Sequence, residues 1–103
     1  MRVELVGITK SDSIVLGKLP VLIGQDSETD IQLGDPTVGR YHCLIQRIDD
    51  HVMVWDLGTG EGTFVNDAQV NKAYLEPGDK LRLGRTDFLV NYEHSTRRSL
   101  IGV

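Results

Sequence analysis

Residues able to recognise a ligand are concentrated in one glycine-rich stretch, WDLGTGEGTFVND, at positions 55–67. Its glycines, Gly58, Gly60 and Gly62, permit backbone conformations that side chains forbid, or let a ligand approach the main chain closely. Loops held by a rigid β scaffold are where binding residues concentrate. The stretch is therefore either a tight turn without a binding role or a recognition loop.

Sequence patterns for catalysis, nucleotide binding and metal binding do not occur in the chain. The glycine-rich stretch lacks the GxxxxGK[ST] pattern, and its GxGxxG spacing fails at Thr63. Asp26, Glu28 and Asp30 alternate as the acidic residues do at the start of a calcium loop. The positions of such a loop that require glycine and glutamate carry Ile31 and Thr37 here, so a calcium site is not predicted. Cys43 lies in an apolar run and is expected to be a small buried hydrophobe. We therefore predict no enzyme activity, no cofactor and no metal site.

The elements that position this stretch are predicted to be short β-strands. Apolar runs alternate with turn residues, and no segment has a helical period. A two-residue connection at 49–50 indicates a hairpin, and Glu76-Pro77-Gly78-Asp79 indicates a β-turn. Trp55 and Phe64 are expected in the core, with Val65 at its rim. The expected strands are residues 2–6, 14–16, 19–23, 31–33, 43–48, 51–55, 63–65, 69–70, 73–75, 80–83 and 87–92. This pattern predicts an all-β sandwich or barrel.

Composition and charge exclude several classes of partner. The chain has 103 residues, enough for one domain with its own core, and we expect that domain over residues 1–93 with a tail or linker over 94–103. Fifteen acidic against eleven basic residues give a net charge of -4, which argues against nucleic acid or an anionic membrane as partner. One cysteine and no long apolar run favour a reducing, cytoplasmic location.

An ordered set of motifs resembles the forkhead-associated (FHA) domain family over about residues 2–92. The motifs are Gly24, Gly39-Arg40-Tyr41-His42, the stretch from Asp56 to Asn66, Pro77-Gly78-Asp79, and Leu81 to Gly84. The resemblance implies a β-sandwich of about eleven short, mostly antiparallel strands. It also implies that the loops at one end of the sandwich bind phosphothreonine peptides.

The residues that contact the peptide in this family are replaced at several positions here. The resemblance places an arginine at Gln25, a serine at Gly39, and a threonine and an asparagine at Gly60 and Glu61. The peptide-binding positions that it implies are Gln25, Gly39, Arg40, Gly60, Glu61 and Asn66. A loop-bracing role is expected for His42, Gly24 and Gly62, whereas Asn66 has the alternative role of capping its own turn.

These replacements weaken an anion site. Arginine offers a charged, forked donor that glutamine cannot replace, and each lost hydrogen bond to a charged group costs about 1.5 to 3 kcal/mol. We therefore expect a phosphothreonine peptide to lose roughly 4 to 6 kcal/mol of binding free energy, which is three or four decades in affinity. Arg40 is expected to pair with Glu61 in the vacated site. The predicted recognition loops hold more acidic residues than Arg40 balances, namely Asp26, Glu28, Asp30, Asp35, Glu61 and Asp67.

We therefore predict a non-enzymatic signalling module that recognises a protein or peptide through its loops, with phosphothreonine dependence weakened or lost. The partner expected is either phosphorylated on Ser or Thr, or basic and unphosphorylated. One alternative is phosphothreonine binding retained through Arg40 and the backbone of the glycine-rich loop. Another is a docking domain of a longer signalling protein that uses a sheet face, for which an exposed apolar face would be evidence.

Overall fold

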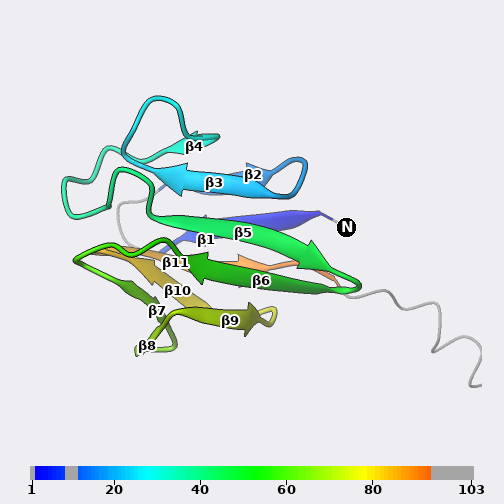
Figure 1. Ribbon diagram of the computed structural model, residues 1–103. Coiled ribbons are helices and arrows are strands. Elements are labelled where there is room, and N and C mark those ends of the chain that lie inside the picture. Colours follow the sequence, from blue (N-terminus) through cyan, green and yellow to red (C-terminus); the bar gives the residue numbers. More distant parts are fainter. Residues whose placement is uncertain (1, 9–11, 94–103) are drawn as a thin grey trace, which may run out of the picture.

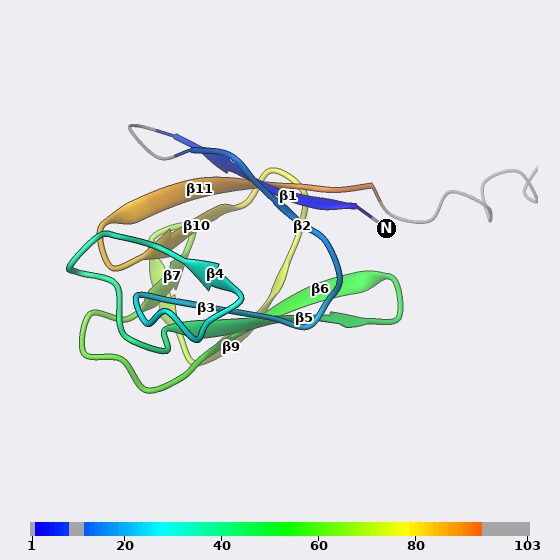
Figure 2. The same cartoon turned by 90° about the horizontal axis from the view of Figure 1, so that it is seen from above.

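Two β-sheets packed face to face form the described part of the chain (Figures 1 and 2). The computed structural model describes residues 2–8 and 12–93, and the regular elements in those residues are all strands. The strands are β1 (Val3–Gly7), β2 (Ile14–Leu16), β3 (Val21–Gly24), β4 (Ile31–Gln32), β5 (Cys43–Ile48), β6 (His51–Asp56), β7 (Thr63–Val65), β8 (Ala68–Val70), β9 (Lys72–Leu75), β10 (Lys80–Leu83) and β11 (Thr86–Asn91). These residues contain no helix of the length and apolarity needed to cross a membrane.

The topology matches the predicted fold class. Sheet A has six strands in the order β2-β1-β11-β10-β7-β8, and sheet B has five in the order β4-β3-β5-β6-β9. Among the described residues β3 and β4 pair in parallel, and the other paired strands are antiparallel. The prediction of an all-β sandwich of mostly antiparallel strands is therefore confirmed. The expected tail, residues 94–103, lies outside the described residues.

The core lies where the inward faces of the two sheets meet, because alternate residues of a strand point to opposite sides. In β6 the inward residues Val52 and Val54 are fully buried, and Ile45 of β5 lies opposite Val54 and is also fully buried. The largest fully buried apolar side chains come from both sheets: Phe88, Leu5, Leu16, Ile23, Ile45, Leu75, Leu81 and Leu83. Their burial holds the two sheets together.

The expectation that Trp55 is a core residue is wrong. Trp55 follows the inward-facing Val54, so strand alternation turns its side chain to the outer face of sheet B, where it is only partly buried. Its indole N–H donates to the Gln46 side chain over 3.1 Å, and the Lys72 ammonium lies 5.2 Å from its ring centroid. An apolar run alone did not reveal which residues of β6 point inward.

The expectation that Phe64 is a core residue is wrong for the same reason, whereas Val65 lies at the rim of the core as expected. Val65 packs against the core, whereas Phe64 is partly exposed on the outer face of sheet A. The guanidinium of Arg82, the cross-strand neighbour of Phe64, lies 4.2 Å from the Phe64 ring centroid. A cation over an aromatic face compensates in part for leaving the ring outside the core.

The predicted turns occur, and each has the backbone geometry that its residues favour. Asp49 has φ 56° in the two-residue connection between β5 and β6. Asn66 and Asp67 have φ 50° and 71°, as the two central residues of a type I′ hairpin turn require. Gly78 has φ 93°, and the Asp79 N–H donates to the Glu76 carbonyl over 3.0 Å. Positive φ at these positions explains the use of Asn, Asp and Gly.

The carboxylate of Asp56 organises the loop at 57–62. It accepts hydrogen bonds from the Gly58 N–H at 2.9 Å, the Thr59 hydroxyl at 3.1 Å and the Thr63 hydroxyl at 2.8 Å. Burial opposes ionisation of Asp56, but the bonds from Thr63, Gly58 and Thr59 outweigh it, so the pKa of Asp56 is lowered. One ionised side chain at the end of β6 thus fixes both ends of the loop.

Gly24, the last residue of β3, lies against the loop that precedes β5. A Cβ at this position would lie 2.1 Å from the Arg40 carbonyl oxygen and 3.0 Å from the Gly39 carbonyl oxygen. Both obstacles are main-chain atoms, which cannot move aside as a flexible side chain can. The close approach lets the Gln25 and Asp26 N–H groups donate to the same two carbonyls, at 2.9 and 3.1 Å.

We predict that Gly24→Ala destabilises the domain by about 1–3 kcal/mol, because the added methyl overlaps backbone that has no room to shift. Gly34→Ala is the matched control, since a Cβ there meets nothing within 4 Å, and its effect is expected within about 0.5 kcal/mol. Urea unfolding of both variants measures the difference. Equal stability of the two variants would refute the close approach.

We also predict that Asp56→Asn lowers the free energy of unfolding at neutral pH by about 1–2 kcal/mol, because the hydrogen bonds lose their charged acceptor. The pKa of Asp56 is lowered on folding, so its contribution is present above its ordinary value of 3.8 and is lost as pH falls through the lower folded value. Urea titrations across this range should show the variant and the wild type converging in acid. A difference that stays constant with pH would contradict this role.

Candidate functional site

Four loops meet at one end of the sandwich, at the left in Figure 1. We call them the apical loops: residues 25–30, 33–42, 57–62 and 84–85. They are joined by hydrogen bonds across the gaps between them, from Gln25 N–H to the Gly39 carbonyl at 2.9 Å and from Arg85 N–H to the Thr37 hydroxyl at 2.8 Å. Every predicted site residue except Asn66 lies in these loops or beside them.

His42 ties two apical loops together from a fully buried position. Its Nδ1 accepts the Gly39 N–H at 2.9 Å, and its Nε2 lies 2.8 Å from the Gly62 carbonyl oxygen. Because an N–H can only donate, Nδ1 must be the acceptor, and Nε2 therefore carries the proton that it donates to Gly62. This neutral imidazole bridges the loop before β5 and the loop before β7.

Gly39 and Thr59 occupy complementary space. A Cβ at position 39 would lie 2.5 Å from the Thr59 Cγ2, and the Thr59 hydroxyl is already held by Asp56. The serine that the FHA resemblance implies at position 39 therefore does not fit while Thr59 keeps its methyl group. A Cβ at Gly60 would meet nothing within 4 Å, so that position has room for a larger side chain.

The Gln25 side chain is directed at the protein's own backbone. Its Nε2 donates to the Asp35 carbonyl over 3.4 Å, and the Gln25 carbonyl accepts the side-chain amide of Gln32 at 3.0 Å. Gln25 is partly buried. The position where the family has an arginine thus carries a neutral amide that already has a partner.

Arg40 pairs with Asp26, and the expected pairing with Glu61 is wrong. The Arg40 Nη2 lies 2.9 Å from the Asp26 Oδ2, and Glu61 has no ion pair among the described residues. The hydrogen bond between the Asp26 N–H and the Arg40 carbonyl brings the two backbones together, which places Asp26 within reach of the guanidinium. The backbone N–H of Glu28 and the Arg40 guanidinium lower the pKa of Asp26, so it stays ionised.

Two arginines that the sequence analysis did not assign to the site lie near the apical loops. Arg85, in the β10–β11 turn, and Arg82, in β10, line a shallow depression of about 350 Å³ together with Glu61, Phe64 and Asp87. The acidic excess around Glu61 is therefore smaller than the sequence predicts. The sequence did contain a sign of their position, since the spacing of Leu81 to Phe88 is that of a hairpin. The turn of this hairpin, with Arg85, lies at the end of the sandwich where β7 begins.

Asn66 is not brought into the apical loops. It lies in the β7–β8 turn, at the opposite end of β7 from Thr63. Its Oδ1 accepts the Lys80 N–H at 2.9 Å and its Nδ2 donates to the Asp79 carboxylate at 3.0 Å. These bonds join the β7–β8 turn to residues 79–80, where β10 begins, so the expectation that Asn66 caps its own turn is also wrong.

The outer face of sheet B has mixed character. Tyr74 is 52% exposed and Trp55 partly so, but the polar side chains of Lys72, Gln46 and His51 lie among them. This is not the uniformly apolar face that would favour a docking domain.

Cys43 is fully buried, and burial together with nearby Asp56 raises the pKa of its thiol well above the usual range. A thiol in that environment does not ionise at neutral pH and is a poor nucleophile. In the part of the chain that the structure describes, no three His, Cys, Asp or Glu residues are grouped to hold a metal ion.

Comparison with known proteins gives consistent relatives. The oxoglutarate dehydrogenase inhibitor of Corynebacterium diphtheriae is 39% identical over 62 residues, which cover 60% of this chain and 43% of that protein. The glycogen accumulation regulator GarA of Mycobacterium tuberculosis is 36% identical over 62 residues, covering 60% of this chain and 38% of that protein. The matches thus span less than half of these relatives.

Solved structures resemble the whole sandwich. An FHA domain solved in a study of phosphothreonine-dependent FHA domain interactions has a TM-score of 0.83 and 28% identity, covering 92% of this chain and 100% of that one. The FhaA FHA domain, in complex with the intracellular domain of another protein, has a TM-score of 0.75 and 28% identity over 87% of this chain and 98% of that one. The FHA domain family model matches residues 21–84, more than half of the chain. The chain therefore belongs to the FHA domain family.

Proposed function

We propose that this domain binds a protein or peptide through its apical loops and that its dependence on phosphothreonine is weakened or lost. One observation carries the proposal: the Arg40 guanidinium is paired with the Asp26 carboxylate at 2.9 Å, although its side chain is 76% exposed. The pair as a whole has no net charge, so it attracts an anionic ligand less than an unpaired arginine would. Gln25, at the position of the other family arginine, is neutral.

The electrostatic balance of the apical loops supports an unphosphorylated, basic partner. These loops contain five carboxylates, namely Asp26, Glu28, Asp30, Asp35 and Glu61, against the two guanidinium groups of Arg40 and Arg85. A surface with this excess attracts cations and repels a dianionic phosphate.

Retention of phosphothreonine binding through the loop backbone is less well supported, because several of the N–H groups already have acceptors. Gly58 N–H donates to Asp56, Gly62 N–H donates to the Thr59 hydroxyl at 3.1 Å, and Gly39 N–H donates to His42. A phosphate would have to displace bonds that hold the loops together. Arg85 is the group best placed to rescue anion binding, so it enters the test below.

The names of the relatives suit a binding role without catalysis. One is called an inhibitor of oxoglutarate dehydrogenase and another a regulator of glycogen accumulation. We propose that the present domain likewise regulates by binding. The identity of its partner and its cytoplasmic location stay predictions.

We predict that wild-type protein binds a phosphothreonine peptide pool at least about 100-fold more weakly than Gln25→Arg/Glu61→Asn, because two charge-assisted donor sites are restored and a like charge is removed. Isothermal titration calorimetry measures both. Ser27→Arg in a Glu28→Gln background is the matched control, since the two changes alter the net charge by the same two units at exposed positions of an apical loop. Gly39→Ser is added only together with Thr59→Ser, which removes the obstructing methyl group.

The outcomes separate the alternatives. If the wild type binds as tightly as the restored variant, phosphate dependence is retained and the proposal fails; loss of that binding in Arg85→Gln would then identify the anion contact. If Ser27→Arg/Glu28→Gln gains as much as the restored variant, only general charge is involved. A gain in phosphopeptide affinity that is confined to the restored variant supports the proposal that the natural loops have lost phosphothreonine binding.

A further inference from the structure

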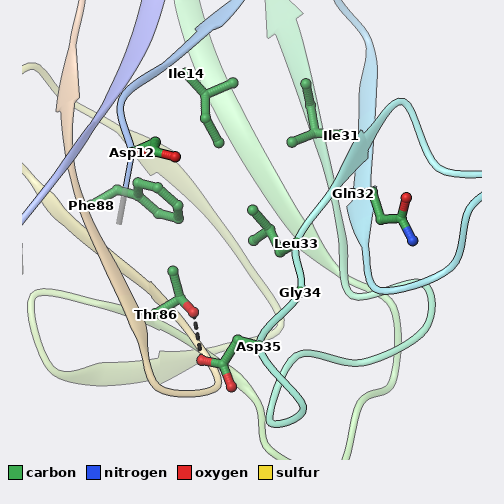
Figure 3. Close-up of a pocket in the computed structure, with 9 residues that line it drawn as sticks. All are labelled: Asp12, Ile14, Ile31, Gln32, Leu33, Gly34, Asp35, Thr86 and Phe88. Carbon is green, nitrogen blue, oxygen red and sulfur yellow. Dashed lines mark hydrogen bonds between the residues drawn. The ribbon is translucent and has the colours of Figure 1, made fainter. Parts of the chain in front are cut away.

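A groove runs along one side of the sandwich, between the edge strands of the two sheets (Figure 3). β2 is the edge of sheet A and β4 is the edge of sheet B, and both lie on the same side of the molecule in Figure 1. The groove has a volume of about 430 Å³. Its lining residues are Asp12, Ile14, Ile31, Gln32, Leu33, Gly34, Asp35, Thr86 and Phe88. It therefore lies along the side of the sandwich, extending from the apical end at Asp35 and Thr86.

Part of the groove lining is apolar, and the rest comes from polar residues. Phe88 is buried, and the side chains of Ile14, Ile31 and Leu33 are only partly covered where they pack on the core. Figure 3 shows Phe88, Ile14 and Leu33 turned toward the space between the two sheets. Partly covered Ile and Leu side chains gain further burial if an apolar group enters the groove.

The charged groups that line the groove are acidic. Asp12 is exposed at one margin, and Asp35 lies at the end nearest the apical loops. Hydrogen bonds from the Thr86 hydroxyl at 2.6 Å and the Thr37 N–H at 2.8 Å lower the pKa of Asp35, so this carboxylate stays negative. No Lys or Arg of the described residues lines the groove. Its charge therefore complements a cation.

The groove is also bordered by unpaired strand edges. β2 pairs with β1 alone and β4 pairs with β3 alone among the described residues, so each has one side without a neighbour. A free strand edge offers backbone N–H and carbonyl groups to an extended chain. A strand added along β2 would point alternate side chains toward Ile31 and Leu33.

We propose that this groove binds an unphosphorylated extended segment of a partner protein, in which apolar side chains and Lys or Arg side chains lie on the same face of the strand, at alternate positions. The segment adds to the free edge of β2, its apolar side chains fill the groove, and its basic side chains lie near Asp12 and Asp35. None of Gln25, Arg40 and Glu61 lines this groove, which meets the apical loop at residues 33–35.

The test uses the whole chain labelled with ¹⁵N and a pool of unphosphorylated heptapeptides in which alternate positions, which share one strand face, carry both Val or Ile and Lys or Arg. Saturable changes in the amide resonances of residues 12–16 and 31–35 are expected. A second pool with Glu in place of the basic residues should bind at least about tenfold more weakly. The same basic pool with alternate residues N-methylated should lose affinity, because N-methylation removes the donors of a strand ladder.

Two charge reversals locate the binding surface. Asp12→Lys should weaken binding of the basic peptide pool by about tenfold. Glu93→Lys makes an equal change of charge at an exposed residue outside the groove, and should leave the affinity for the pool within about twofold of the wild type. The resonance changes in the wild type need no variant, so a folding defect cannot mask the result. Changes confined to residues 25–30, 39–42 and 57–62 would overturn the proposal in favour of the apical loops. Absence of saturable binding, equal loss in the two variants, or concentration-dependent dimerisation that covers the groove would overturn it as well.

Discussion

The buried imidazole of His42 is the interaction on which the apical loops depend. It accepts the Gly39 N–H and lies 2.8 Å from the Gly62 carbonyl, so one ring fixes the spacing of two loops that are 20 residues apart in sequence. A buried ring with both nitrogens paired incurs little penalty, whereas one with an unpaired nitrogen would. Asp56 acts beside it by ordering residues 57–62. The scaffold of an FHA recognition surface is therefore intact in this chain.

The side chains at the family's peptide-contacting positions differ from the family pattern in several related ways. Gln25 is bound to backbone, Arg40 is paired with Asp26, and Gly39 leaves the space that the Thr59 methyl group occupies. These features are mutually consistent, since Thr59 and a side chain at position 39 exclude each other. The apical loops of this protein thus form a closed hydrogen-bonded network of their own. On the function proposed above, this surface recognises the shape and positive charge of a protein partner and not a phosphate.

Strand alternation links this surface to the rest of the domain. Because the period is two residues, β6 places Val52 and Val54 in the core and Trp55 outside. The same rule exposes Phe64 beside Arg82, and so creates the depression next to Glu61. On the other side of the sandwich, the short edge strands β2 and β4 leave the core partly uncovered. The two proposed binding surfaces both lie where the sheets end, at the apical loops and at the edge strands.

The strands, the turns and the family were predictable from the sequence, because these depend on local patterns. Asn66-Asp67 and Gly78 allow the positive φ of their turns, and apolar runs mark the strands. The motifs also located Gln25, Gly39, Glu61 and His42. Only the tertiary structure decided which partner each polar side chain takes. Acidic residues in several loops could have paired with Arg40. It pairs with Asp26 because backbone hydrogen bonds join the loop after β3 to the loop before β5. The groove likewise required both sheets, since its residues come from three separate stretches of the chain, 12–14, 31–35 and 86–88. Pairing and cavities depend on distances between remote segments, which local patterns do not encode.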